Sequence, residues 1–285
     1  MSEHTELLSV QGLDVEYRSR RFGRRPFRAV SDVSLTIGVG ETLGLVGESG
    51  SGKTTIGRAI LGLAPITNGT IILDGEDISH ATRAARRRIS GDLQVVFQDP
   101  YTSLNPSMTI GAILAEPITV QGTARADARK RVATLLDQVG LPANSIDRYP
   151  REFSGGQRQR VAIARALALE PRLIVCDESV SALDLTTQAR ILDLFLQIQR
   201  DTGVSYLFIS HDLDVVRHLS HRIAVLYRGS IVEQGAAMRV TEHPEHPYTK
   251  RLLMAAPVPD VDLQAERRAA RAALVGSLES THELS

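Results

Sequence analysis

A phosphate-loop motif constrains this chain most. It is Gly47-Glu48-Ser49-Gly50-Ser51-Gly52-Lys53-Thr54, which matches the pattern G-x-x-x-x-G-K-[ST] at every fixed position and is followed by Thr55. A strand-like apolar run over residues 42–46 precedes it, and helical spacing follows it as far as Leu63. The glycines let backbone N–H groups turn towards an anion, which the N-terminal end of the helix also favours. The motif therefore predicts a nucleotide triphosphate site, with Lys53 on the β- and γ-phosphates and the Thr54 hydroxyl on Mg²⁺.

Length and composition set broad limits on the rest. The 285 residues suffice for one large domain with one or two subdomains and a tail. Lysine plus arginine equals aspartate plus glutamate at 33 each, so net charge does not indicate a nucleic-acid partner. The single cysteine, Cys176, excludes an internal disulfide framework and fits a reducing compartment such as the cytosol. We expect no secretory signal and no membrane-spanning segment in this chain.

The residues before the phosphate loop predict two strands joined by a basic loop. Leu7–Tyr17 and Ala29–Ile37 alternate apolar and polar side chains. Tyr17 either closes its strand or stacks on an adenine face, since an aromatic ring offers both. The loop is a solvated surface or a site for nucleic acid or acidic lipid, and no nucleic-acid fold signature accompanies its charges. Its arginines are Arg18, Arg20, Arg21, Arg24, Arg25 and Arg28.

The region after the first helix predicts a helical insertion in an α/β core. Pro100, Asn105-Pro106 and Pro117 interrupt the chain after Gln98, and helical spacing then runs from Ala126 to Val139. A further helix begins after Ser154, which suits an N-cap. A solvated helix face is expected from the arginines upstream of this insertion, Arg83, Arg86, Arg87 and Arg88.

The core then resumes as alternating strands and helices. Residues 172–178 form a short apolar run ending in two carboxylates, as a buried central strand does. A helix over Thr187–Gln199, a strand over Ser205–Ile209 and a hairpin over 222–234 follow. This alternation predicts a mainly parallel sheet covered on both faces.

Polar residues end several of these strands on one rim of the sheet. Asp177 would face Mg²⁺ near the phosphate loop, and Glu178 would contact the attacking water. Gln98 and His211 follow two other strands and would point to the same rim. Each is weak evidence alone, but ligands of open α/β sheets bind where strand ends converge.

A second anion-binding helix start lies at Ser154-Gly155-Gly156-Gln157. A capping serine and two glycines leave its backbone N–H groups accessible. Because the phosphate loop already surrounds its own nucleotide, this segment makes sense if it serves a nucleotide bound to another subunit.

These motifs together resemble the nucleotide-binding subunits of ATP-binding cassette (ABC) transporters. The resemblance covers about Leu7–Gly235 and includes Ser181-Ala182-Leu183-Asp184. It implies that Tyr17 stacks on adenine, that Thr54 and Gln98 serve Mg²⁺, and that Asp177 holds it through water. It also implies that Glu178 is the general base, that His211 contacts the γ-phosphate and that Asp184 links two sites. Ser154, Gly155, Gly156 and Gln157 would bind the partner's ATP.

A subfamily resemblance narrows this further. The stretches over 97–106 and His246-Pro247-Tyr248-Thr249 look like dipeptide, oligopeptide and nickel importers. The resemblance implies a nucleotide-binding domain over residues 1–235, with a helical subdomain at about 100–168, and an extension over 236–285. Because the cysteine cluster of some relatives is missing here, we expect no iron-sulfur centre. Expected partners are a second, paralogous ATPase, two transmembrane permease subunits and an extracytoplasmic binding protein, at the cytoplasmic face of the inner membrane.

Three alternatives stay open. The subfamily resemblance favours a peptide as the solute, with nickel or another small solute as the alternative. A soluble ABC ATPase acting on nucleic acid or ribosomes is supported only by the arginine clusters. A subunit that binds ATP without hydrolysing it is disfavoured by the presence of Glu178 and His211.

Overall fold

A mainly parallel sheet forms the centre of the protein. The computed structural model describes residues 5–17, 26–99 and 103–255. Within these residues the six-stranded sheet has the order β10-β9-β3-β8-β7-β6, with β10 antiparallel to β9 and the other neighbours parallel. Its strands are β3 (Thr42–Val46), β6 (Leu93–Val96), β7 (Leu173–Asp177), β8 (Ser205–Ser210), β9 (Arg222–Tyr227) and β10 (Ser230–Ala236).

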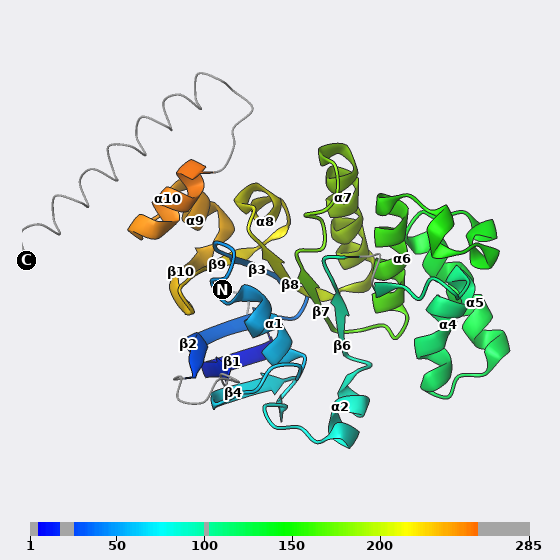
Figure 1. The fold of residues 1–285 in the computed structure, drawn as a ribbon, viewed down its shortest axis with the longest axis horizontal. Coiled ribbons are helices and arrows are strands. Elements are labelled where there is room, and N and C mark those ends of the chain that lie inside the picture. The colour runs from blue at the N-terminus through cyan, green and yellow to red at the C-terminus, as the bar shows by residue number, and fades with distance from the viewer. Residues whose placement is uncertain (1–4, 18–25, 100–102, 256–285) are drawn as a thin grey trace, which may run out of the picture.

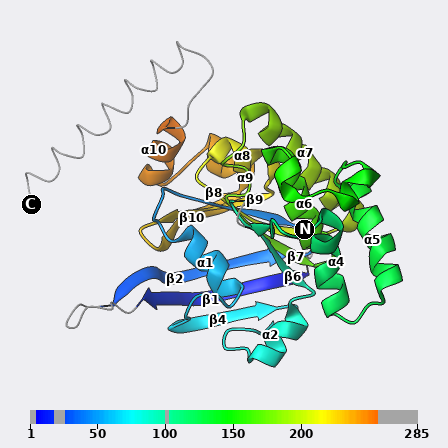
Figure 2. The same cartoon turned by 45° about the vertical axis from the view of Figure 1, so that its right-hand side comes forward.

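A smaller antiparallel sheet packs against this core. Its order is β2-β1-β4-β5, and β1 pairs with both β2 and β4. Figure 2 shows helix α1 (Lys53–Ile60) between the two sheets. The strands are β1 (Glu6–Tyr17), β2 (Phe27–Gly38), β4 (Asn68–Leu73) and β5 (Glu76–Asp77).

The helices cover the central sheet and form a separate helical region. Figure 1 shows α4, α5 and α6 together at one end of the molecule, and α8, α9 and α10 towards the other. In the described ranges, no helix combines the length and apolar character needed to span a bilayer. The remaining helices are α2 (Arg83–Ile89), α4 (Ile110–Val120), α5 (Arg125–Gln138), α6 (Gly155–Leu167), α7 (Leu185–Thr202), α8 (Leu213–Leu219), α9 (Ala237–Glu242) and α10 (Pro247–Ala255), with short 3₁₀ helices η1 (Ala143–Asp147) and η2 (Pro150–Glu152).

The central sheet is buried on both faces, because side chains that alternate along each strand enter two different cores. In β7, Val175 packs with α1 and the antiparallel sheet, whereas Cys176 packs with α6, α7 and α8. Leu207 and Phe208 of β8 divide in the same way. The predicted α/β phosphate-loop core, antiparallel subdomain and helical insertion are confirmed, and α9 and α10 follow the last strand.

One predicted interruption is wrong. Pro117 does not break the chain but lies inside α4, which continues to Val120. A proline removes one helical N–H, and tertiary packing can offset that loss. Here Ile113, Leu114 and Ile118 bury one face of the helix. Burial of this apolar face therefore stabilises α4 by more than Pro117 destabilises it.

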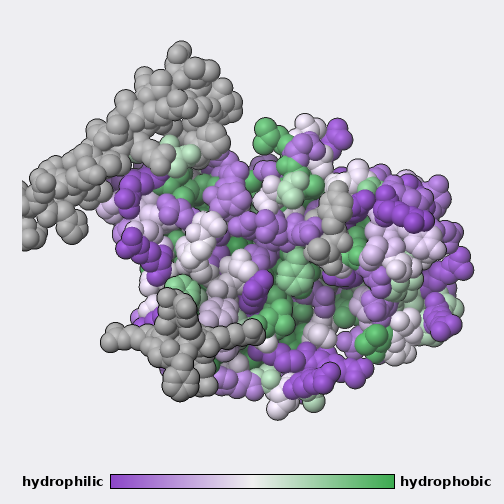
Figure 3. Space-filling model, viewed as in Figure 1, coloured by the Kyte–Doolittle hydropathy of each residue, from purple (hydrophilic) through white to green (hydrophobic). Residues whose placement is uncertain are grey.

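The arginine-rich helix α2 also differs from expectation at one position. Arg83, Arg87 and Arg88 are exposed, but Arg86 is half-buried. Its guanidinium donates hydrogen bonds to the carbonyls of Ile60 and Ile78, so it joins α2 to the end of α1. Arg18, Arg20, Arg21, Arg24 and Arg25 lie outside the described residues. Figure 3 shows a largely hydrophilic surface towards α2 and the outer helices, with hydrophobic residues nearer the centre of the view.

Candidate functional site

The phosphate loop joins β3 to α1 on the rim formed by the carboxyl ends of the parallel strands. Gly52 precedes the helix at φ 109°, a conformation that favours glycine, and a Cβ there would lie 2.5 Å from the Ala29 carbonyl. The Lys53 ammonium is buried in the loop and donates to the carbonyls of Gly47 at 2.8 Å and Glu48 at 2.9 Å. Burial lowers the pKa of Lys53, and neighbouring carboxylates oppose that shift. The loop is thus already closed around its lysine.

Two oxygen-bearing side chains meet at the start of α1. The Thr54 hydroxyl donates to Asp177 Oδ1 at 2.9 Å, which joins the first helix to the end of β7. Burial raises the pKa of Asp177, a shift that the Thr54 hydrogen bond opposes and the charge of Glu178 reinforces. Asp177 thus lies beside the phosphate loop, as predicted.

Glu178 directly follows β7 and lies beside the end of the neighbouring strand β8. Its backbone has φ 49°, a strained conformation for a residue other than glycine, and its N–H donates to the Ile209 carbonyl at 2.9 Å. Its carboxylate lies 3.4 Å from the imidazole of His211. The hydroxyl of Ser181 donates to the Glu178 carbonyl at 2.9 Å and accepts from Gln98 Nε2 at 3.3 Å. The structure therefore brings together residues from three strand ends.

A pocket of about 450 Å³ opens in front of these groups. Tyr17, which ends β1, and Phe27, which begins β2, face each other in the strand register and line one side. The other lining residues are Ala29, Ser49, Gly50, Gly52, Lys53, Thr54, Thr55, Gln98 and Glu178. The pocket thus has an aromatic end and a polar end that contains the phosphate loop.

Phe27 was missed by the sequence analysis. It is 66% exposed, far more than the strand's inward residues, and it lies beside Tyr17 only because β1 and β2 pair in this register. A phenylalanine at a strand start is a weak signal alone. The apolar alternation does not give the register, because β1 and β2 pair with several register shifts.

The segment that starts α6 lies apart from this lining. Ser154 and Gln157 form a capping box, with the Ser154 N–H donating to Gln157 Oε1 at 3.0 Å and the Gln157 N–H donating to Ser154 Oγ at 3.4 Å. A Cβ on Gly156 would lie 2.4 Å from Thr187 Cγ2. Asp184 caps α7 through the Thr187 N–H at 3.0 Å, and this hydrogen bonding lowers the pKa of Asp184. In the described residues, neither segment lines the phosphate-loop pocket.

The donor set beside the loop fits Mg²⁺ by its chemistry. The Thr54 hydroxyl and the Asp177 carboxylate are hard oxygen ligands, and Gln98, whose side chain also carries an amide oxygen, lines the same pocket as Thr54. Within the described ranges no group of three or more His, Cys, Asp or Glu side chains could hold a metal alone. Mg²⁺ usually needs only one or two carboxylates, because substrate phosphates and water complete its shell.

Comparison with known proteins settles the family. The family model described as ABC transporter matches residues 30–181. The chain belongs to this family. It is 49% identical to the oligopeptide transport ATP-binding protein OppF of Lactococcus lactis, over 93% of this chain and 84% of that protein. It is 48% identical to the glutathione import ATP-binding protein GsiA of Salmonella paratyphi A, over 93% of this chain but only 44% of GsiA. The chain thus spans less than half the length of GsiA.

Solved structures agree with this cassette's fold. The ATP-binding cassette MJ0796, solved as a dimer in a post-hydrolysis state with ADP and Pi, matches with a TM-score of 0.72 and 28% identity, over 81% of this chain and 99% of that one. CbiO1 of Clostridium perfringens matches with a TM-score of 0.75 and 25% identity, over 84% of this cassette and 92% of CbiO1. The chain is thus an ABC-family cassette by both sequence and fold.

Proposed function

We propose that this cassette binds and hydrolyses ATP to drive a membrane importer of di- or oligopeptides. The observation that carries the proposal is the single rim on which Lys53, the Thr54–Asp177 pair and the Glu178–His211 pair meet. Phosphoryl transfer to water needs charge neutralisation at the phosphates and a group that orients the water. Lys53 can neutralise charge and Glu178 can orient the water, and both line the same pocket.

Each group on the rim has a proposed role. Lys53 would leave its loop carbonyls for the phosphates, and Thr54, Gln98 and Asp177 would hold Mg²⁺, with Asp177 acting through water. When bound, Mg²⁺ neutralises charge on the phosphates. Glu178 would accept a proton from the attacking water, which its carboxylate can reach at the pocket wall.

Other residues would orient the nucleotide. His211 lies beside Glu178 and would contact the γ-phosphate. Tyr17 and Phe27 would stack on the adenine, because they form the aromatic end of the pocket. The loop residues Gly47 to Thr55 would surround the phosphates.

A second subunit would complete the site. Ser154, Gly155, Gly156 and Gln157 start a helix whose backbone N–H groups suit a phosphate, yet they lie apart from this chain's own pocket. We therefore assign them to the ATP held by a partner ATPase, with a paralogue favoured over a second copy. Asp184, which caps the neighbouring helix α7, would link the two sites.

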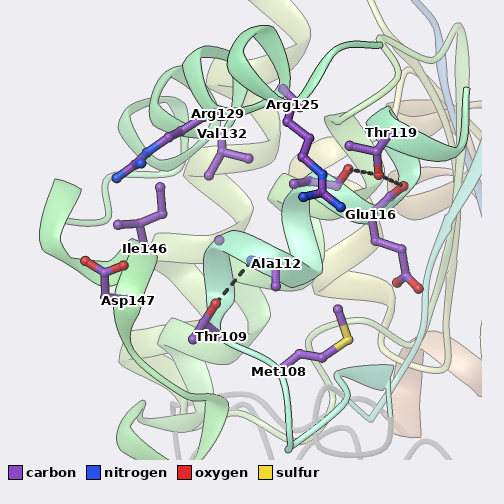
Figure 4. Close-up of a pocket in the computed structure, with 13 residues that line it drawn as sticks. Met108, Thr109, Ala112, Glu116, Thr119, Arg125, Arg129, Val132, Ile146 and Asp147 are labelled. Atoms are coloured by element: carbon purple, nitrogen blue, oxygen red, sulfur yellow. Dashed lines mark hydrogen bonds between the residues drawn. The ribbon is translucent and has the colours of Figure 1, made fainter. Parts of the chain in front are cut away.

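A groove in the helical region is the surface that we assign to the permease. Its volume is about 520 Å³, between α4, α5 and η1. Figure 4 shows Arg125 and Arg129 from α5, and Glu116 and Asp147 from the opposing segments. Met108, Ala112, Val132 and Ile146 add apolar surface. Mixed charge around an apolar floor suits a cytoplasmic loop of a permease.

Movement of α6 would reach this groove through its contacts with α4, α5 and the segment before α4. Arg165 of α6 donates a hydrogen bond to the carbonyl of Ser103, in the segment between Gln98 and α4. Closure of the ATPase dimer on ATP would shift α6, and with it this segment. Loss of the γ-phosphate would then reopen the dimer.

The proposed solute is a peptide, and the proposed location is a membrane surface. The named functions of OppF and GsiA support a peptide solute, with nickel or another small solute as the alternative. Two permease subunits and an extracytoplasmic binding protein would complete the importer, and this ATPase would lie on the cytoplasmic face of the inner membrane. We propose residues 1–235 as the nucleotide-binding domain, with its helical subdomain at about 100–168, and residues 236–285 as the extension.

The experiment that tests this function is a capture from native membranes. Tagged Glu178→Gln protein is recovered from detergent-solubilised membranes with ATP present, and its partners are identified by mass spectrometry. We expect a second ATPase and multi-spanning permease subunits. Recovery of ribosomal or nucleic-acid-binding proteins, with no membrane subunit, would contradict the importer and favour the soluble alternative.

A further inference from the structure

The C-terminal segment contains a tyrosine that the ATPase function does not account for. Tyr248 stands in the second position of α10, and only 2% of it is exposed. Its ring stacks on Tyr227 at the end of β9, with centroids 4.2 Å apart and planes inclined by 36°. Figure 1 shows α10 beside α9, at the β10 edge of the central sheet. The ring packing fixes where the Tyr248 hydroxyl can lie.

That hydroxyl contacts the phosphate loop. The backbone N–H of Glu48 donates to the Tyr248 oxygen at 3.0 Å, across 200 residues of sequence. The carbonyl of the same peptide group belongs to Gly47 and accepts from Lys53 Nζ at 2.8 Å. One peptide group, at the entrance of the loop, is therefore held from both ends.

The neighbouring hairpin supports the loop from the same region of the protein. The Gly229 N–H, in the turn between β9 and β10, donates to the Ser51 carbonyl at 2.9 Å. A Cβ on Gly47 would lie 2.2 Å from the carbonyl of Leu226, so the loop approaches β9 closely. Tyr227 follows Leu226 and carries the ring on which Tyr248 stacks. The hairpin and α10 thus form a continuous support for the loop.

The start of α10 is itself anchored to the central sheet. The Glu233 carboxylate of β10 accepts from the N–H groups of Glu245 at 2.9 Å and His246 at 3.0 Å. His246 Nδ1 accepts from the Tyr248 N–H at 3.1 Å. These hydrogen bonds leave Tyr248 little freedom to move independently of β10.

We infer that Tyr248 is a positioning residue for ATP binding, whose hydroxyl sets the orientation of the Gly47–Glu48 peptide. It is not a catalytic residue, because it does not line the nucleotide pocket. Its contribution matters most when ATP is bound, since Lys53 then turns to the phosphates and leaves the Gly47 carbonyl. The Tyr248 hydroxyl continues to hold the N–H end. The inference rests on the proposed role of the loop and adds a residue of the C-terminal extension to it.

A single-atom variant tests this inference. Tyr248→Phe keeps the ring packing and removes only the hydroxyl. Losing one neutral hydrogen bond should raise the Kd for a fluorescent ATP analogue, and the KM for ATP, between about twofold and about tenfold. The kcat should stay within about twofold of wild type, because nothing that touches the reacting atoms changes.

Tyr206→Phe is the matched control. The Tyr206 hydroxyl is also buried and donates to the Phe195 carbonyl at 3.3 Å, in the core beside α7. This variant should lower the melting temperature without changing the Kd. Unchanged Kd and KM in Tyr248→Phe would overturn the inference. So would a loss of affinity that both variants share in proportion to their lost stability.

Hydrogen exchange gives a second measurement that does not depend on activity. In the nucleotide-free full chain, exchange in the peptide covering Gly47 to Ser51 should be faster in Tyr248→Phe than in wild type or Tyr206→Phe. Equal exchange in all three proteins would also overturn the inference. A wild-type protein that bound no ATP would instead contradict the proposed function, and the exchange data would still test the Tyr248 contact.

Discussion

The Glu178 carboxylate lies 3.4 Å from the His211 imidazole, Oε1 to Nδ1, at the ends of the adjacent strands β7 and β8. The pairing depends on a strained backbone, since Glu178 has φ 49° and is held by a hydrogen bond from its N–H to the Ile209 carbonyl. Strain of this kind persists only where the surrounding structure holds it, and it is common at functional sites. The parallel sheet thus brings a carboxylate and an imidazole together at one rim, and Glu178 also lines the pocket.

The Thr54 hydroxyl should be needed for Mg²⁺ use. Thr54→Val keeps the side chain's shape but removes the group that donates to Asp177. The variant loses a proposed Mg²⁺ ligand and the hydrogen bond to Asp177. The Mg²⁺ concentration for half-maximal ATPase activity should therefore rise at least about tenfold. Thr134→Val on α5, whose hydroxyl donates to the Lys130 carbonyl, is the control. An unchanged Mg²⁺ titration for Thr54→Val would contradict the metal assignment.

Asp177 should cost stability at neutral pH. Its pKa in the folded protein is raised above the ordinary value of 3.8, so the folded state binds the proton more tightly than the unfolded chain. Stability therefore falls as pH rises from 3.8 through the folded-state pKa, and the cost is present at pH 7. Asp177→Asn removes the charge and still offers Thr54 an acceptor.

This variant should melt higher while losing activity. At pH 7.5 the melting temperature of Asp177→Asn should rise by about 2–4 °C for each kcal/mol gained, and the gain should shrink at lower pH. Mg²⁺-dependent ATPase activity should be lost. A melting temperature below that of wild type at both pH 5 and pH 7.5 would show that the carboxylate stabilises the fold.

Tyr17 and Phe27 should bind the adenine ring of ATP. Tyr17→Ala and Phe27→Ala should each weaken ATP binding, by about tenfold where the full stacking contact is lost. Met238→Ala on α9 is a control, because Met238 is about as exposed as Phe27 and lies outside the pocket. Equilibrium titration with ATP measures the effect. Unchanged affinity in both aromatic variants would mean that these rings only complete the strand pair.

Gly156 should be needed for two separable reasons. Gly156→Ala would bring a Cβ within 2.4 Å of Thr187 Cγ2, so it should lower the melting temperature. Adding Thr187→Ser removes that methyl and should restore stability. ATPase activity of the complex should stay low in the double variant, because the added Cβ would still obstruct the proposed approach of this backbone to the partner's ATP. Wild-type activity in the double variant would assign Gly156 to packing alone.

Local patterns predicted much of the fold. The apolar run ending at Asp177 predicts a strand buried on both faces, and Ser154 with Gln157 predicts a helix start. Both features depend on residues that are neighbours in sequence. The rim residues could be predicted for the same reason. Parallel strands bring their carboxyl ends to one edge, so the order of strands and motifs suffices.

The remaining features depend on contacts between distant segments. Pro117 is tolerated because of what the rest of α4 buries, and Arg86 is drawn inward by carbonyls at the ends of other elements. Phe27 joins the pocket through strand register. The Tyr248 contact with Glu48 spans 200 residues and leaves no periodic signal. Such features need the packed structure.

Whether Glu178 is the general base is tested by measuring phosphate release from purified wild type and Glu178→Gln, with ATP binding measured on the same samples. The amide keeps the size of the carboxylate but cannot accept the proton of the attacking water. We predict that Glu178→Gln binds ATP with about the wild-type Kd and releases phosphate at least about a hundredfold more slowly. Wild-type turnover by Glu178→Gln would contradict the assignment of Glu178 as the general base and the account of the rim built around it.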